Sequence, residues 1–131
     1  MTKHSPHRRP DKVHGWRHIV AATRYSMAGF RRLLDESAFR HETMAFGVIV
    51  ILFFAVGAKL SDHVIAFILF LLIAAFEAIN TAIEELVDRI SPELSAMARH
   101  AKDLGSFSVF CLVIANGAWA AYVLGSALFG W

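Results

Sequence analysis

Three polar side chains interrupt an otherwise apolar stretch in the second half of the chain. Glu77, Asn80 and Glu84 are spaced so that all three fall on one face of a helix. The twenty residues Val64–Ile83 are long enough to cross a bilayer core. An acidic side chain inside a membrane helix costs about 2.5–3.5 kcal/mol on insertion scales, so it is rarely retained without a use. The stripe therefore predicts a polar site where this helix meets the membrane surface.

Carboxylates beside an amide and a lysine at a membrane surface are suited to phosphoryl transfer. Mg²⁺ prefers oxygen ligands, often one or two carboxylates plus substrate phosphates, and Glu36 and Glu84 could supply the carboxylates. Lys102 could neutralise phosphate charge, and Glu77, in a drier setting, could accept a hydroxyl proton. The chain has neither a G-x-x-x-x-G-K-[ST] loop nor a protein-kinase glycine loop. A nucleotide would therefore have to be held by these side chains.

Two other interpretations stay open on the residues alone. A small membrane assembly protein could use the stripe to join its helices and set its oligomeric state. An ion or proton pathway could use Glu77 as its titrating group. Against a pathway, Val64–Phe76 is wholly apolar, so the polar stripe does not continue across the membrane.

The composition favours one membrane domain. Of the 131 residues, 56% are hydrophobic and 18% charged, against about 25% charged in soluble domains. The single cysteine, Cys111, excludes an intramolecular disulfide. The basic N-terminal region lacks an aromatic-interleaved patch or known reader motif, so we expect no nucleic-acid partner.

The expected fold is an all-α membrane protein. Residues 1–14 are basic and contain two prolines, which predicts a disordered tail before a single domain at 15–131. Residues 15–35 alternate apolar and arginine faces at helical spacing, which predicts an amphipathic helix on the membrane surface. The apolar runs predict membrane spans at about 39–58, 64–90 and 101–129.

The distribution of positive charge predicts the orientation. With three spans, Lys59 is the one Lys or Arg on the side of the 59–63 turn, and the other twelve lie on the opposite side. The positive-inside rule then makes the N-terminus cytoplasmic. Residues from separate segments converge at that boundary: Glu36, Glu42, Glu77, Asn80, Glu84, Lys102 and Asp103.

Three motifs carry a resemblance to a known family. They are E-A-x-N-T-A-I-E-x-x-V-D-R at Glu77–Arg89, A-K-D-x-G-S at Ala101–Ser106, and E-S-A-F-R-H-E at Glu36–Glu42. Over about residues 16–125 the chain resembles the prokaryotic diacylglycerol kinases. Two departures are His18, where the family often has arginine, and a stretch between Gly29 and Glu36 that is one residue shorter than in many relatives.

The resemblance implies a homotrimeric bundle of three-span chains in the bacterial inner membrane, with a cytoplasmic N-terminus and a periplasmic C-terminus. Such enzymes transfer the γ-phosphoryl group of ATP, with Mg²⁺, to a lipid hydroxyl at the cytoplasmic face. Some members phosphorylate diacylglycerol and others undecaprenol; the motifs here look more like the diacylglycerol branch, with undecaprenol as the alternative.

By the same resemblance, Glu77 is the expected catalytic base, Asn80 the essential amide, and Glu36 and Glu84 the metal ligands. The positions that match the nucleotide site are Arg17, Tyr25, Glu36, Glu84, Glu93, Leu94, Ser95, Lys102 and Asp103. Those that match the lipid site are Ala38, Phe39, Arg40, His41, Glu42, Glu77 and Ser106.

Overall fold

The computed structural model describes residues 15–93 and 95–130. Within them the chain forms four α-helices and no strand: α1 (Trp16–Leu34), α2 (Ser37–Ala55), α3 (Leu60–Ile90) and α4 (Ala96–Phe129). The expected tail 1–14, the predicted nucleotide contact Leu94 and the last residue, Trp131, lie outside the described residues. Helices α2, α3 and α4 are each long and apolar enough to cross a membrane. The prediction of an all-α membrane protein is confirmed.

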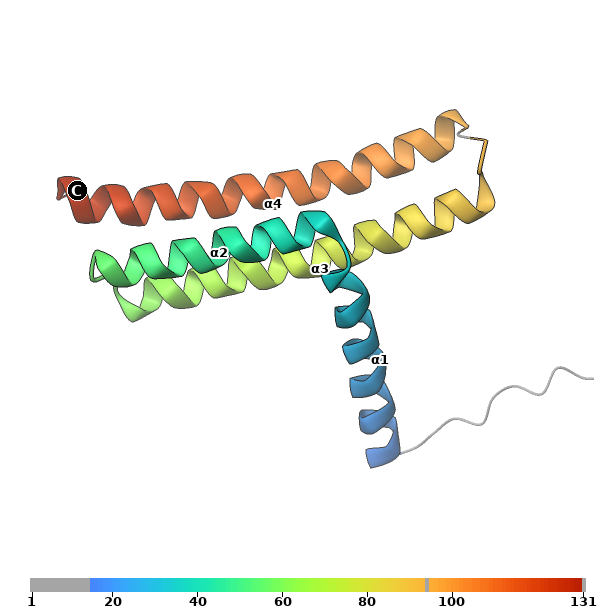
Figure 1. The fold of residues 1–131 in the computed structure, drawn as a ribbon, viewed down its shortest axis with the longest axis horizontal. Coiled ribbons are helices and arrows are strands. Elements are labelled where there is room, and N and C mark those ends of the chain that lie inside the picture. The colour runs from blue at the N-terminus through green and yellow to red at the C-terminus, as the bar shows by residue number, and fades with distance from the viewer. Residues whose placement is uncertain (1–14, 94, 131) are drawn as a thin grey trace, which may run out of the picture.

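Helices α3 and α4 run side by side in opposite directions, and α2 packs along one end of this pair (Figure 1). The turn between α2 and α3 lies at the same end as the C-terminus, while the turn between α3 and α4 lies at the other end. Helix α1 leaves the bundle transversely from a corner beside the middle of α3. This direction suits a helix that lies in the plane of a membrane which the other three cross.

The corner between α1 and α2 consists of Asp35 and Glu36, so α2 begins two residues before its predicted start. Arg40 donates from Nη1 to the carbonyl oxygens of Leu34 and Asp35, at 3.3 and 2.9 Å. These carbonyls at the end of α1 would otherwise lack a partner. The other end of α2 is earlier than predicted, because Gly57, with φ of 68°, turns the chain in a left-handed conformation.

Two caps make α3 and α4 start earlier than their apolar runs. Before α3, the Asp62 carboxylate accepts the backbone N–H of Lys59 at 3.0 Å, and the helix begins at Leu60 instead of Val64. Before α4, the Ser95 hydroxyl accepts the backbone N–H of Ala98 at 3.2 Å. Helix α4 therefore starts at Ala96 instead of residue 101.

Aromatic packing holds the corner to the bundle. Phe39 of α2 is only 1% exposed and lies between Phe30 of α1 and Phe70 of α3, at centroid distances of 6.5 and 6.0 Å. Phe46 of α2 stacks on Phe70 at 4.4 Å. These contacts fix where Glu36, at the start of α2, lies against α3.

Polar contacts join α3 to α4 within the apolar region. The Asn116 amide donates to Leu112 O at 2.9 Å and, across the interface, to Leu69 O at 3.4 Å. Amide side chains commonly pack membrane helices together in this way. Near the far end, Trp119 donates from Nε1 to Asp62 O at 3.2 Å. These two hydrogen bonds between helices help to fix the register of α3 against α4.

Candidate active site

The predicted stripe on α3 faces the interior of the bundle. Glu77 is 5% exposed and Asn80 9%, and Glu84, one turn further along, is half-buried. Thr81, beside Asn80, is also buried. The helical spacing of these residues predicted one shared face, and the structure confirms it. The same face meets α2 at one level and α4 at the next.

Asn80 lies at the closest approach of α3 and α4. Its Nδ2 donates to Glu84 Oε1 at 2.9 Å. Its Oδ1 is buried without a hydrogen-bond partner among the described residues and faces Gly105 of α4, where a Cβ would overlap it. Gly105 therefore makes room for the amide that orients Glu84. Sequence reasoning assigned Gly105 no role, although it lies inside the A-K-D-L-G-S motif.

The carboxyl groups of Glu42, from α2, and Glu77, from α3, lie next to each other. Oε2 of Glu42 is buried and has no hydrogen-bond partner in the described part of the chain. Glu36 and Glu84 are also close enough to Glu77 to act on it electrostatically. The structure thus brings together the predicted base, one predicted lipid-site residue and both predicted metal ligands.

An apolar pocket of about 170 Å³ opens beside Glu42, between α2, α3 and α4. Phe46 and Phe70 line one part of it, and Val113 and Asn116 of α4 line another. The carboxyl pair therefore lies next to a space with apolar walls. A carboxyl pair beside an apolar cavity suits a lipid alcohol, which has a polar hydroxyl and apolar chains.

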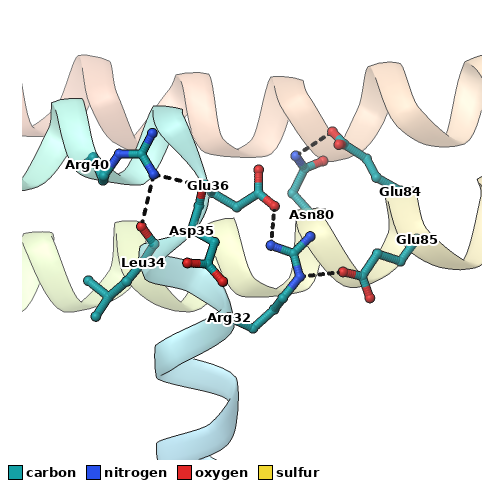
Figure 2. A network of polar contacts seen from close by, with 8 residues as sticks. All are labelled: Arg32, Leu34, Asp35, Glu36, Arg40, Asn80, Glu84 and Glu85. Carbon is teal, nitrogen blue, oxygen red and sulfur yellow. Dashed lines mark hydrogen bonds and ion pairs between the residues drawn. The ribbon is translucent and has the colours of Figure 1, made fainter.

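A cation that the sequence did not single out occupies the mouth of the site. Arg32, near the end of α1, contacts Glu36 Oε1 from Nη1 at 2.6 Å and Glu85 Oε1 from Nε at 2.7 Å (Figure 2). The hydrogen bond to Glu36 is the largest cause that raises the pKa of the Arg32 guanidinium above its ordinary value, and the hydrogen bond to Glu85 is the next largest. The spacing of Arg32 and Glu36 could have suggested their pair, but the contact with α3 depends on the corner between α1 and α2.

Lys102 of α4, predicted to neutralise phosphate charge, pairs with Asp88 of α3 at 2.6 Å. It is close enough to Glu84 to interact with it electrostatically as well. Asp103 is exposed beside it, and Glu93 is exposed in the turn between the two helices. Ser95 caps α4 and accepts a hydrogen bond from Ser91 Oγ at 3.2 Å. These predicted nucleotide contacts line the end of the α3–α4 pair.

The two nucleotide contacts predicted on α1 are not brought to the carboxylates of the same chain. Arg17 and Tyr25 line an open pocket of about 270 Å³ together with Trp16 and Arg24. This pocket lies on the outer part of α1, which extends away from α3 (Figure 1).

The predicted lipid segment divides between exposed and buried positions. Its exposed members are Ala38, Arg40, His41 and Ser106. Phe39 has no open surface in the single chain, because its ring packs between α1 and α3. This packing positions the start of α2.

The oxygen ligands present suit a metal ion that arrives with phosphates. Within residues 15–93 and 95–130, no group of three or more His, Cys, Asp or Glu side chains is arranged to hold a metal by itself. Glu36 and Glu84 each offer a carboxylate near Glu77. One or two carboxylates, completed by substrate phosphates and water, form the usual protein environment of Mg²⁺ at a nucleotide. The donor set therefore fits Mg²⁺ bound together with ATP.

Comparison with known proteins agrees with this chemistry. Residues 24–124 match the family described as prokaryotic diacylglycerol kinase. A diacylglycerol kinase of a Sinorhizobium species is 57% identical over 114 residues, which cover 87% of this chain and 83% of the relative. Those of Haemophilus influenzae and Escherichia coli are 36% and 35% identical, over 78% and 76% of this chain and 90% and 83% of their own lengths. The chain therefore belongs to the prokaryotic diacylglycerol kinase family.

Proposed function

We propose that this protein is an ATP-dependent lipid kinase that transfers the γ-phosphoryl group to the hydroxyl of diacylglycerol and forms phosphatidic acid. The observation that carries the proposal is the burial of Glu77 among carboxylates from two helices, beside an apolar pocket in a membrane bundle. Family membership favours this activity over an ion pathway or an assembly role. The named relatives favour diacylglycerol over undecaprenol as the acceptor.

In this mechanism Glu77 accepts the proton of the lipid hydroxyl while that oxygen bonds to the γ-phosphorus and ADP leaves. Asn80 holds Glu84 in place through its 2.9 Å hydrogen bond. Glu36 and Glu84 would hold Mg²⁺, which supplies charge neutralisation to the phosphate oxygens. The phosphoryl group needs positioning and charge compensation more than covalent help, which agrees with a site made of carboxylates and a few cations.

The diacylglycerol would enter from the membrane with its hydroxyl toward Glu77. Glu42 lies beside that carboxyl and beside the apolar pocket, so it is placed to orient the lipid head. We propose Ala38, Arg40, His41 and Ser106 as further lipid contacts, with Phe39 supporting them from behind. The nucleotide would approach from the water side, where the proposed contacts are Arg17, Tyr25, Glu93, Leu94, Ser95, Lys102 and Asp103.

We also propose that the enzyme is a homotrimer in the bacterial inner membrane, with a cytoplasmic N-terminus and a periplasmic C-terminus. Large apolar side chains cover the outer faces of all three spans, including Phe54, Phe67 and Phe107, so these faces suit lipid or neighbouring subunits. A neighbouring subunit would supply the walls that three helices alone leave open. The positive charges at the N-terminal side support the orientation.

The test is phosphoryl transfer from radiolabelled Mg·ATP by purified protein in lipid-containing micelles. Diacylglycerol and undecaprenol are offered side by side, with Glu77→Gln as the control. Label in phosphatidic acid that is lost in the variant is the expected result. Label on undecaprenol alone would change the acceptor, and no transfer by folded protein would refute the proposal.

A further inference from the structure

Among the described residues, Arg32 is the one Lys or Arg that forms an ion pair with a proposed metal ligand, Glu36. Its two contacts use different nitrogens: Nη1 binds Glu36 and Nε binds Glu85. The guanidinium can therefore release one carboxylate without releasing the other. Its side chain is 47% exposed, so solvent already reaches the group that would have to move. Figure 2 shows it between the start of α2 and the outer part of α3.

The charges around Arg32 explain why a cation is needed there. Glu36 and Glu84 both act electrostatically on Glu77, and Glu85, which pairs with Arg32, adds a fourth carboxylate. ATP brings more negative charge than one Mg²⁺ neutralises, so its approach to this cluster is opposed unless a protein cation faces the phosphates. Two other cations of this region, one of them the proposed nucleotide contact Lys102, pair with groups other than the proposed metal ligands. Lys102 is held by Asp88, and Arg40 is held by the carbonyl oxygens at the end of α1.

We propose, on the basis of the kinase function above, that Arg32 is a nucleotide-binding residue that exchanges Glu36 for a phosphate oxygen of ATP. Before the nucleotide binds, Nη1 neutralises Glu36 and so occupies a proposed metal ligand. When the nucleotide binds, Arg32 releases Glu36, remains bound to Glu85 through Nε, and donates from its free nitrogens to the phosphate. A guanidinium suits this role because its planar set of donors can serve a carboxylate and a phosphate together.

In this proposal Glu85 is a positioning residue. It lies next to Glu84 in sequence but holds Arg32, whereas Glu84 accepts from Asn80. Neighbouring carboxylates on α3 thus bind different partners, which keeps the guanidinium beside the proposed metal ligands. The competing explanation is a static ion pair that only fastens α1 to α3.

The two explanations predict different effects of Arg32→Gln. The experiment uses the full chain in detergent micelles with diacylglycerol. One measurement titrates Mn²⁺ alone by electron paramagnetic resonance, and another measures the affinity for the Mg²⁺ complex of a non-hydrolysable ATP analogue. We expect Mn²⁺ to bind several-fold more tightly, because Glu36 is freed, and the nucleotide about tenfold more weakly, because a charged hydrogen bond is lost. The KM for Mg·ATP should rise with it, while the KM for diacylglycerol stays unchanged.

Loss of a static clamp would loosen α1 from α3 and lower both affinities together, and the Arg31→Gln control below identifies opposite shifts that come from charge alone. Loss of Mn²⁺ and nucleotide affinity together, or a change in the KM for diacylglycerol of similar size, would overturn the proposal. Unchanged Mn²⁺ affinity in Arg32→Gln would also overturn the proposal. The same holds if neither the unmodified chain nor the variant binds Mn²⁺. Turnover of the unmodified chain is measured in parallel. If that chain transfers no phosphate, the kinase function fails and the Arg32 proposal fails with it; if it is active and the variant behaves normally, only the Arg32 proposal fails.

Three further variants serve as controls. Arg31→Gln removes the same charge from the neighbouring residue of α1, which makes no ion pair in the described structure, and it should leave both affinities unchanged. Arg32→Lys keeps a charge but loses the planar donor set, so part of the nucleotide affinity should return. Glu85→Gln loosens the hold on the guanidinium but leaves its pair with Glu36, so nucleotide affinity should fall without a gain in Mn²⁺ affinity. A gain in Mn²⁺ affinity for Arg31→Gln would show that the effect is general charge and overturn the proposal.

Discussion

The close approach of α3 and α4 at Gly105 allows a sharp test of how the site is held together. In Gly105→Ala, the added Cβ would overlap Asn80 Oδ1 and lie 3.3 Å from Asn80 Cγ. Two responses can relieve the overlap. Either Asn80 rotates and loses its hydrogen bond to Glu84, or the two helices separate at this level. The first response frees Glu84 from Asn80. The second leaves that hydrogen bond within α3 intact but moves Lys102 of α4 away from Glu84.

The size of the effect follows from these two routes. Overpacking of a well-packed contact costs about 1–3 kcal/mol. Loss of a hydrogen bond to a charged group costs about 1.5–3 kcal/mol. If the latter is felt fully in phosphoryl transfer, kcat/KM should fall by roughly 10- to 100-fold, since about 1.4 kcal/mol is a factor of ten. We therefore expect a loss of activity that exceeds the loss of folded protein.

The assay compares kcat/KM and the thermal midpoint of Gly105→Ala with those of Gly47→Ala. Gly47 lies within α2, and a Cβ there would meet no atom within 4 Å. The control should be active and stable. Adding Asn80→Ala to Gly105→Ala removes the overlapping side chain, so stability should recover while activity remains low. If Gly105→Ala alone has normal activity and a normal thermal midpoint, the proposed coupling of Gly105, Asn80 and Glu84 is wrong.

Three other outcomes are expected. Glu77→Gln should keep the fold and the thermal midpoint but lower kcat by roughly 10²- to 10⁴-fold, the usual contribution of a general base; near-normal turnover would refute that role. Glu84→Gln should raise the Mg²⁺ concentration needed for half-maximal activity and the KM for ATP more than the KM for diacylglycerol, and an unchanged metal requirement would contradict its assignment. Ser95→Ala should lower the free energy of unfolding by about 1 kcal/mol through loss of the α4 cap, with Ser108→Ala, in the interior of the same helix, as the comparison; equal stability of wild type and Ser95→Ala would show that the cap is unimportant.

The part of the site that follows one helix was predictable. Glu77, Asn80 and Glu84 share a face because of the helical period, and their presence in an apolar run marked that face as one with a use. The number of spans followed from the length of the apolar runs for the same reason. Their ends did not, since the starts of α3 and α4 depend on Asp62 and Ser95 as caps, outside the apolar pattern.

Contacts between helices could not be predicted from the helical spacing of residues along the sequence. Arg32 and Glu85 are 53 residues apart in the chain, and their pair depends on where the corner at Glu36 lies against α3. The contact of Gly105 with Asn80 depends on the register of α3 against α4, to which hydrogen bonds from Asn116 and Trp119 contribute. The pair of Lys102 with Asp88 was likewise not predictable, because it depends on the early start of α4, which presents Lys102 to the outer turn of α3.

The polar residues of α3 follow a gradient that suits a reaction between a lipid and a water-soluble nucleotide. Glu77 is 5% exposed, and Asp88, about three turns further along, has a side chain that is 62% exposed. Glu84 lies between them in both position and burial. Glu84, the proposed metal ligand, lies about two turns beyond Glu77, the proposed base, and each turn advances about 5.4 Å. This separation is comparable to the depth over which a membrane surface changes from apolar to aqueous. A lipid hydroxyl can therefore remain at the level of Glu77 while the phosphates approach at Glu84, so neither substrate has to leave its own phase.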